Sequence, residues 1–167
     1  MATTYNYIDR TSADYADYFG DATYKPAYLK NRLYVVQRTI NLATAATDVG
    51  ADLVQNDVLK VIDVPANTWV IALFARVTTT QSTLTDVDIG IDVTSPNTNT
   101  GDVDGFIDGM SFASAATSTS IANAGFGIGA TGGKYFIVAD TIDMLFIDST
   151  FTCTGVVEIT VLMMDCS

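Results

Sequence analysis

The stretch from Asp57 to Val93 has the clearest pattern of hydrophobic and polar positions, and the rest of the chain is organised around it. Three apolar runs lie there, at Asp57–Val64, Thr68–Thr79 and Leu84–Val93, joined by two short polar connections. The third run alternates strictly, with hydrophobic residues on one side and acidic residues or glycine on the other. This period of two predicts three consecutive β-strands. Trp69, the only tryptophan, lies in the most apolar run, and we expect it in the core.

Strand-like runs continue on both sides of this centre. Leu33–Leu42 predicts an earlier strand, and the segment from Ala43 to Asp57 is interpreted as a loop containing Gly50. Further strands are expected at Phe106–Phe112 and Thr152–Met164, and Lys134–Ala139 and Ile142–Ile147 predict a hairpin. Between them, residues 94–105 and the small, polar 113–124 predict loops, the latter with short helical turns, and the glycine-rich 125–133 a flexible or sharp connection.

About eight strands with short connections predict an all-β protein. Short connections cannot make parallel crossovers, so the strands should pair antiparallel, in a β-sandwich or jelly roll. The 167 residues fit a single domain, and neither a repeat nor a domain linker interrupts them. We predict an extended N-terminal arm over residues 1–32 and one β-sandwich domain over residues 33–167.

Residues 1–30 differ from the rest of the chain because they carry six of its eight tyrosines but no sustained strand or helix period. One interpretation is a poorly ordered terminus. The other is an arm that lies on a neighbouring subunit, since tyrosine combines large contact area with a polar tip and is enriched at interfaces. On the second interpretation, the candidate capsid or subunit contacts are aromatic residues, namely Tyr5, Tyr7, Tyr15, Tyr18, Phe19, Tyr24 and Tyr28.

Composition supports strands and narrows the choice of partners. Of the 19 acidic residues only Glu158 is glutamate, a good helix former, and the others are aspartate. Few surface helices are therefore expected. A net charge of −11 with dispersed basic residues argues against nucleic acid as a partner. Hydrophobic residues make up 49% of the chain and its mean hydropathy is +0.28, which indicates extensive strand burial or contact with partner chains. No apolar run approaches the roughly 20 residues of a membrane span, and no signal peptide is recognisable.

The residues for catalysis or metal binding are sparse. The chain has no histidine, which removes histidine-based triads and zinc sites. Cys153 and Cys166 lie near opposite ends of the last predicted strand, too far apart for a disulfide, so we expect two free thiols, as suits synthesis in a reducing cytoplasm. We therefore predict no enzyme activity, no catalytic residue and no cofactor.

Three motifs still need an interpretation. Gly127–Gly132 matches the dinucleotide fingerprint G-x-G-x-x-G, but a strand-like run follows it where a helix is required. Asp102–Asp108 resembles the start of a calcium loop without its third and last ligands; a tight Asp-Gly turn is expected, and a weak structural calcium site is the alternative. Asp86, Asp88 and Asp92 share one strand face, which we interpret as solvated sheet surface rather than as paired catalytic carboxylates.

Five segments carry a resemblance to known proteins: DVLKVIDVPANTWVIALFARVTTT, DVDIGID, DVDGFIDGMSF, GGKYFIVADTIDMLFIDST and GVVEITVLMMD. Spread over residues 57–165, they resemble small virion structural proteins of tailed bacteriophages, of the capsid decoration (cement) type. The resemblance implies a β-sandwich or jelly roll, commonly a homotrimer, bound to the major capsid protein on the outer face of the capsid. The tyrosine-rich N-terminus is not part of the resemblance.

The function expected from this resemblance is structural: binding and stabilising the exterior of an expanded shell. Three alternatives stay open. A head fibre or adhesin would bind host-surface carbohydrate through residues 94–105 and 113–133, a single-jelly-roll capsid subunit would be expected to carry a basic inner arm, and an enzyme would need carboxylates, Tyr, Lys or metal. The implied location is the virion surface, after synthesis in the host cytoplasm.

Overall fold

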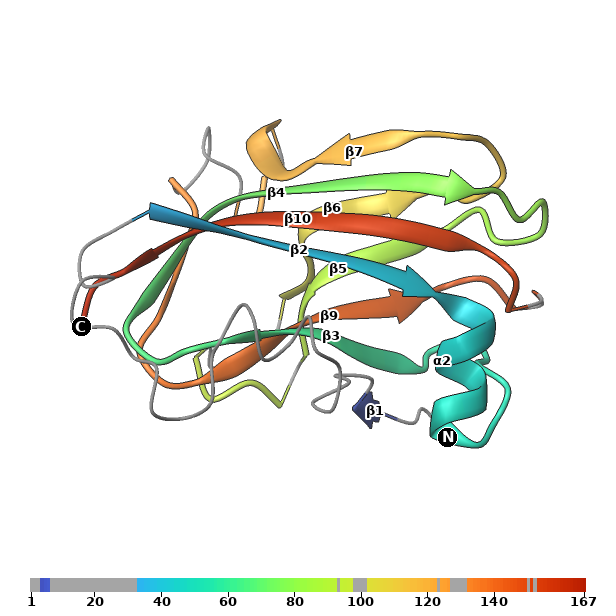
Figure 1. The fold of residues 1–167 in the computed structure, drawn as a ribbon, viewed down its shortest axis with the longest axis horizontal. Coiled ribbons are helices and arrows are strands. Elements are labelled where there is room, and N and C mark those ends of the chain that lie inside the picture. The colour runs from blue at the N-terminus through green and yellow to red at the C-terminus, as the bar shows by residue number, and fades with distance from the viewer. Residues whose placement is uncertain are drawn as a thin grey trace.

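The fold was obtained as a computed structural model. It describes residues 4–6, 33–92, 94–97, 102–122, 124–126, 132–149, 151 and 153–167. These residues form two packed sheets, shown in Figure 1. Sheet A contains, in spatial order, β1 (Thr4–Asn6), β3 (Val58–Val64), β9 (Asp140–Phe146), β5 (Val87–Ile91) and β6 (Asp102–Met110). Sheet B contains β2 (Leu33–Asn41), β10 (Val156–Asp165), β4 (Thr68–Thr79) and β7 (Thr117–Thr119), with β8 (Lys134–Phe136) also paired to β4.

Eight of these strands form a jelly roll. Their antiparallel pairs are nested in sequence: β5 pairs with β6, β4 with β7, β3 with β9, and β2 with β10. The pairs β4–β10 and β5–β9 then complete the two sheets. Such nesting is what results when one long hairpin is rolled into two layers. The predicted antiparallel sandwich or jelly roll of about eight strands is confirmed. The added strand β1 is an exception to the antiparallel rule, because it pairs parallel to β3.

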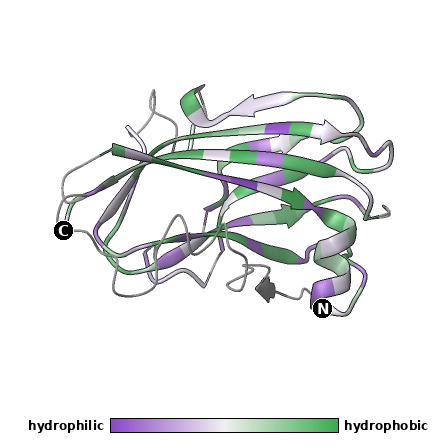
Figure 2. Cartoon of the chain, in the orientation of Figure 1, coloured by the Kyte–Doolittle hydropathy of each residue, from purple (hydrophilic) through white to green (hydrophobic). Residues whose placement is uncertain are grey.

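The core lies between the sheets and comes from the alternation that predicted the strands. In β10 every second residue is buried, from Val157 to Met163. Figure 2 shows hydrophobic and hydrophilic residues alternating along strands of both sheets. The largest fully buried side chains there are four phenylalanines: Phe106, Phe112, Phe136 and Phe146. In the described part of the chain no helix is long and apolar enough to cross a membrane.

The predicted loop after the first strand is wrong, because it begins with helix α2 (Leu42–Val49). Asn41 caps the helix, since its side-chain oxygen accepts hydrogen bonds from the backbone N–H groups of Ala43 and Thr44. Gly50 ends it in the left-handed conformation, at φ 72°. The helix buries Leu42 and Ala45 and closes one end of the sandwich (Figure 1). A 3-10 helix, Ser120–Ala122, confirms the helical turn expected within 113–124, a segment that also holds β7.

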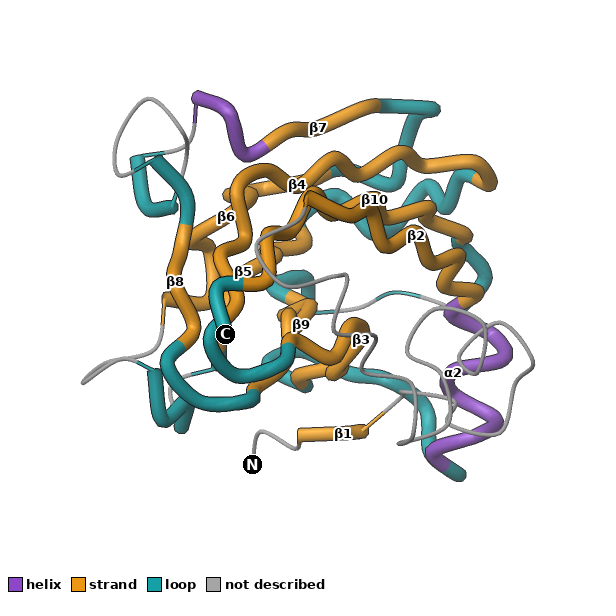
Figure 3. Tube along the Cα trace, turned by 60° about the vertical axis from the view of Figure 1, so that its left-hand side comes forward, coloured by secondary structure: helices purple, strands orange, loops and turns teal. Residues whose placement is uncertain are grey.

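The predicted hairpin of the late strands is also wrong, because β8 pairs with β4 in sheet B and β9 pairs with β3 and β5 in sheet A. The chain crosses between the sheets at Ile137–Ala139. The Asn97 side chain takes the place of a partner strand there: its amide nitrogen donates to the carbonyl oxygen of Val138 at 3.1 Å and its oxygen accepts from the Val138 N–H at 3.1 Å. Figure 3 shows β8 and α2 on opposite sides of the sheets.

Strand β6 starts earlier than predicted, at Asp102 rather than Phe106. The additional residues belong to a large bulge within the strand. Its register against β5 runs from Ile107 opposite Ile89 to Asp102 opposite Ile91, so residues 103–106 have no one-to-one partners. The bulge lies directly on Gly90, where an added Cβ would come within 2.1 Å of the carbonyl oxygen of Asp102. The expected Asp-Gly turn at Asp102–Asp108 is therefore a bulged edge strand.

Candidate contact surfaces

The described residues do not assemble a metal centre. In that part of the chain no three His, Cys, Asp or Glu side chains lie together as a metal-binding group, and this includes the acidic residues of β6. Cys153 and Cys166 are both free thiols, as predicted. In the dinucleotide-like motif, residues 127–131 lie outside the described residues. The candidate contact surfaces are the outer faces of the two sheets.

The predicted tyrosine contacts lie mostly where the structure gives no description. Tyr5 is the exception: it belongs to β1, and its backbone is in register with Leu59 of β3. The remaining predicted contacts lie outside the described residues, namely Tyr7, Tyr15, Tyr18, Phe19, Tyr24 and Tyr28. The predicted arm therefore contains at least one short strand that adds to the edge of sheet A.

The outer face of sheet A carries carboxylates that are buried, which corrects their predicted solvation. Asp88 is 8% exposed, Asp92 is 6% exposed, and Asp143 of the neighbouring strand β9 is 3% exposed. Asp86 is half-buried beside them. The sequence pattern places these residues on the side of the sheet away from the core, but it gives no sign that residues 102–106 of β6 bulge against β5.

Asp143 is the most strongly perturbed of these groups. Its carboxylate accepts the hydroxyl of Thr141 at 2.6 Å and the backbone N–H of Asp92 at 2.9 Å. Burial raises its pKa to about 7, against the lowering effect of these two hydrogen bonds and of Lys60. Sequence alone could not find this residue, because its burial depends on strands that are distant in sequence.

Two other carboxyl groups on strands of sheet A shift in the same direction. Burial raises the pKa of Asp88, although its oxygen accepts the backbone N–H of Gly109 at 2.9 Å. Burial and the adjoining Asp104 raise the pKa of Asp102 to about 6. The outer side of sheet A is thus an acidic face that holds protons more tightly than exposed aspartates do.

The outer face of sheet B has a different character, and its residues form rows across the strands. The first row joins Leu33 of β2, Met164 of β10, Trp69 of β4 and Tyr135 of β8. The second joins Val35, Leu162 and Ala72. Ala72 is buried, and we call the other six residues of these two rows the apolar patch. Leu33 and Val35 are 59% and 51% exposed, and the rings of Trp69 and Tyr135 lie 6.1 Å apart.

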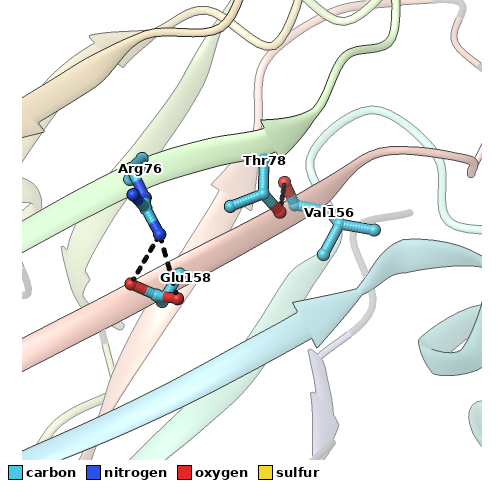
Figure 4. Close-up of polar contacts among 4 residues, drawn as sticks. All are labelled: Arg76, Thr78, Val156 and Glu158. Carbon is cyan, nitrogen blue, oxygen red and sulfur yellow. Dashed lines mark hydrogen bonds and ion pairs between the residues drawn. The ribbon is translucent and has the colours of Figure 1, made fainter.

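The same face becomes polar towards the other end of the strands. The third row contains Gln37, Thr160, Phe74 and Thr119, and the fourth contains Thr39, Glu158, Arg76 and Thr117. Figure 4 shows the single ion pair of these rows, in which Arg76 Nη2 lies 3.3 Å from Glu158 Oε1. Close by, the Thr78 hydroxyl donates to the carbonyl oxygen of Val156 at 3.3 Å.

Sequence reasoning missed the apolar patch, although a signal was present. The start of β2 and the end of β10 lose alternation, in Leu33–Val36 and in Val161–Met164, so both sides of these strands are apolar there. The sequence pattern predicts Trp69 in the core. It lies half-buried on the outer face instead, with its indole N–H donating to the carbonyl oxygen of Gly132 at 3.0 Å.

Comparison with known proteins gives likeness in structure and none in sequence. No protein-family model matches the chain, and no curated protein matches it. A chain from the capsid of Ralstonia phage GP4 has a similar structure, with a TM-score of 0.60, 10% identity, and coverage of 83% of this chain and 87% of that one. A chain from the acidic stable capsid of Helicobacter pylori bacteriophage KHP30 has a TM-score of 0.51, 12% identity, and coverage of 81% and 89%. At these identities the likeness shows a shared fold.

Proposed function

We propose that this chain is a structural protein of a bacteriophage virion. The observation that carries the proposal is the jelly roll itself, which it shares over more than four fifths of its length with a chain from the capsid of Ralstonia phage GP4. Fold alone does not imply function, so the proposal also draws on the surfaces. The apolar patch of sheet B and the acidic face of sheet A suit contact with other proteins better than chemistry on a small molecule.

Within the virion, the proposed role is that of a decoration (cement) protein on the outside of the capsid. The partners would be the major capsid protein and further copies of this chain, in a homotrimer. Binding only to the assembled, expanded shell would stabilise that state by mass action. The net charge of −11 fits the exterior, because an acidic protein facing the packaged genome would be repelled by its phosphates.

The tyrosine-rich segment is the proposed contact with the shell or a neighbouring subunit. Tyrosine rings bury a large area with little loss of conformational freedom, which suits an extended segment reaching a neighbour. Tyr5 is a weaker candidate than the others for such a contact, because its backbone already belongs to sheet A. The segment between β1 and β2 holds the remaining tyrosines of the arm.

Co-sedimentation with empty capsids tests this function directly. The full chain is mixed with expanded and with unexpanded shells, and the bound fraction is measured. We expect binding to expanded shells and much weaker binding to unexpanded ones. Replacing the five tyrosines at positions 7, 15, 18, 24 and 28 by serine should weaken that binding, whereas phenylalanine at the same positions should retain most of it. An absence of binding to either shell contradicts the decoration role.

A second candidate, the carbohydrate-binding adhesin, has one observation in its favour. Trp69 and Tyr135 form a partly exposed aromatic pair on sheet B, and aromatic faces can pack against sugar rings. Since Trp69 is the only tryptophan, its fluorescence reports on this pair alone. Saturable quenching by host-surface glycans, together with no binding to capsids, would favour the adhesin.

A further inference from the structure

The charge of this protein is unevenly distributed over its two sheets. Residues from 33 onward carry 15 of the 19 acidic and 4 of the 8 basic residues, so this part alone has the full net charge of −11. On the outer face of sheet B, the four rows contain one charged pair, Arg76 and Glu158, whose charges cancel. This face is therefore neutral on an otherwise strongly acidic body.

The edges of the sheets are also unequal. In sheet A, the three-residue β1 covers the edge of β3, while β6 at the other edge is bulged and carries exposed Asp104 and Asp108. In sheet B, β7 has only three residues. Short strands, bulges and charges are the devices that keep sheet edges from pairing with other chains.

Strand β2 is longer than β1 and β7 and more regular than β6, and Arg38 is its one charged residue. It runs for nine residues in unbroken register with β10, contains neither proline nor glycine, and has no described strand on its other edge. Its exposed residues Leu33 and Val35 belong to the apolar patch. The edge of sheet B formed by β2 and the apolar patch thus meet at one corner of the sandwich, at the end where β2 begins (Figure 1).

We propose that this corner, made of the apolar patch and the edge of β2 that no described strand pairs with, is the surface through which copies of this chain associate. The inference names a surface for the oligomeric contacts of the proposed function and rests on it to that extent. One neighbour seated at the corner would cover both features, removing apolar surface from water and shielding the edge.

The charge distribution favours a second copy over other occupants. Two bodies of net charge −11 repel each other at every acidic surface, and the neutral face of sheet B is where they can approach with least repulsion. A basic partner would instead be attracted to the acidic face of sheet A. Trp69 and Tyr135 in the first row supply the aromatic residues that are enriched in the centres of interfaces.

The test is the oligomeric state of the full chain, measured by sedimentation velocity and light scattering from about 1 to 100 μM, the range that reports weak and moderate dissociation constants. The natural protein should associate. Val35→Asp should weaken that association by roughly tenfold or more. The change removes an apolar side chain that association would bury, and it adds a negative charge to a surface that meets another acidic chain. Association should also change the fluorescence of Trp69, which lies in the apolar patch.

Thr39→Asp is the matched control, because Thr39 is an exposed residue of the same strand and face, two rows nearer the polar end. It should leave association almost unchanged, and circular dichroism should show both variants folded. A natural protein that stays monomeric at 100 μM overturns the inference, as does equal weakening by both variants. A monomeric Val35→Asp that still binds capsids separates the two proposals: the surface is then confirmed and shell binding does not depend on it.

Discussion

At the scale of single residues, Asp143 shows how the fold accommodates a buried carboxyl group. A buried carboxyl group is stable when its charge is neutralised or hydrogen-bonded, and Asp143 has two donors but almost no water. Lys60 of β3, in register with Asp143, is the basic residue that acts on it, and Asp140 opposes the effect of that lysine. Its carboxyl group therefore holds its proton at a pH where an ordinary aspartate is ionised.

This predicts that the protein is more stable in mild acid than at neutral pH. The pKa of Asp143 is about 7 in the folded chain against an ordinary 3.8, so the folded state binds the proton more tightly. Stability should fall as the pH rises from about 4 to 7, by up to roughly 4 kcal/mol from this group. The raised pKa values of Asp88 and Asp102 act in the same direction. Urea unfolding at a series of pH values measures the trend.

Asp143→Asn identifies the group responsible. The variant should gain stability at pH 8, should gain little at pH 4, and should flatten the pH profile, because the amide cannot ionise. Asp52→Asn, a change at an exposed aspartate, should leave the profile as it is. Stability of the natural protein that increases steadily from pH 4 to 8 would contradict the account of this site.

At the scale of elements, the strands that alternate cleanly were predictable and those that depend on distant contacts were not. β3, β4 and β5 lie within a few residues of the strands that the period of two predicted. Helix α2 was missed because it is short and its start, Asn41, also ends a strand. The two-sided apolar character of residues 134–138 reflects core packing of Phe136 and exposure of Ile137 and Val138, which local pattern cannot distinguish from a hairpin.

The bulge of β6 gives a prediction at this scale. Gly90→Ala places a methyl group within 2.1 Å of the Asp102 carbonyl oxygen and 2.5 Å of the Val103 carbonyl carbon, so the bulge must move. We expect a loss of about 3 kcal/mol or more in the free energy of unfolding, at the upper end of overpacking effects. Because backbone atoms make the contact, no change of rotamer can relieve it.

Gly50→Ala serves as the comparison, since an added Cβ there meets nothing within 4 Å and only the left-handed φ of 72° is unfavourable. That strain costs about 1–2 kcal/mol. Urea unfolding of the two variants should therefore rank Gly90→Ala as the more destabilised. The reverse order would mean that the bulge does not pack against β5 as described.

At the scale of the whole molecule, the two sheets give the sandwich two unlike sides. The acidity and the excess of hydrophobic residues are visible in the sequence. Their assignment to the outer faces of different sheets is not. That assignment requires the order of strands: β10 lies between β2 and β4, so residues near 33, 69 and 164 meet in one row although they are distant in sequence. The same nesting gathers Asp88, Asp92 and Asp143 on the other side.

This sidedness predicts how salt should act on self-association. If copies meet through the neutral corner of sheet B, the opposing force is repulsion between bodies of net charge −11, which salt screens. Raising the salt from about 0.01 to 0.15 M shortens the screening length from about 30 to 8 Å, so the dissociation constant should fall several-fold. Sedimentation velocity at both salt concentrations measures this directly. Val35→Asp should recover part of its lost association in salt, because its added repulsion is also screened. An interface made of ion pairs would weaken in salt, and that result would remove the apolar corner as the contact.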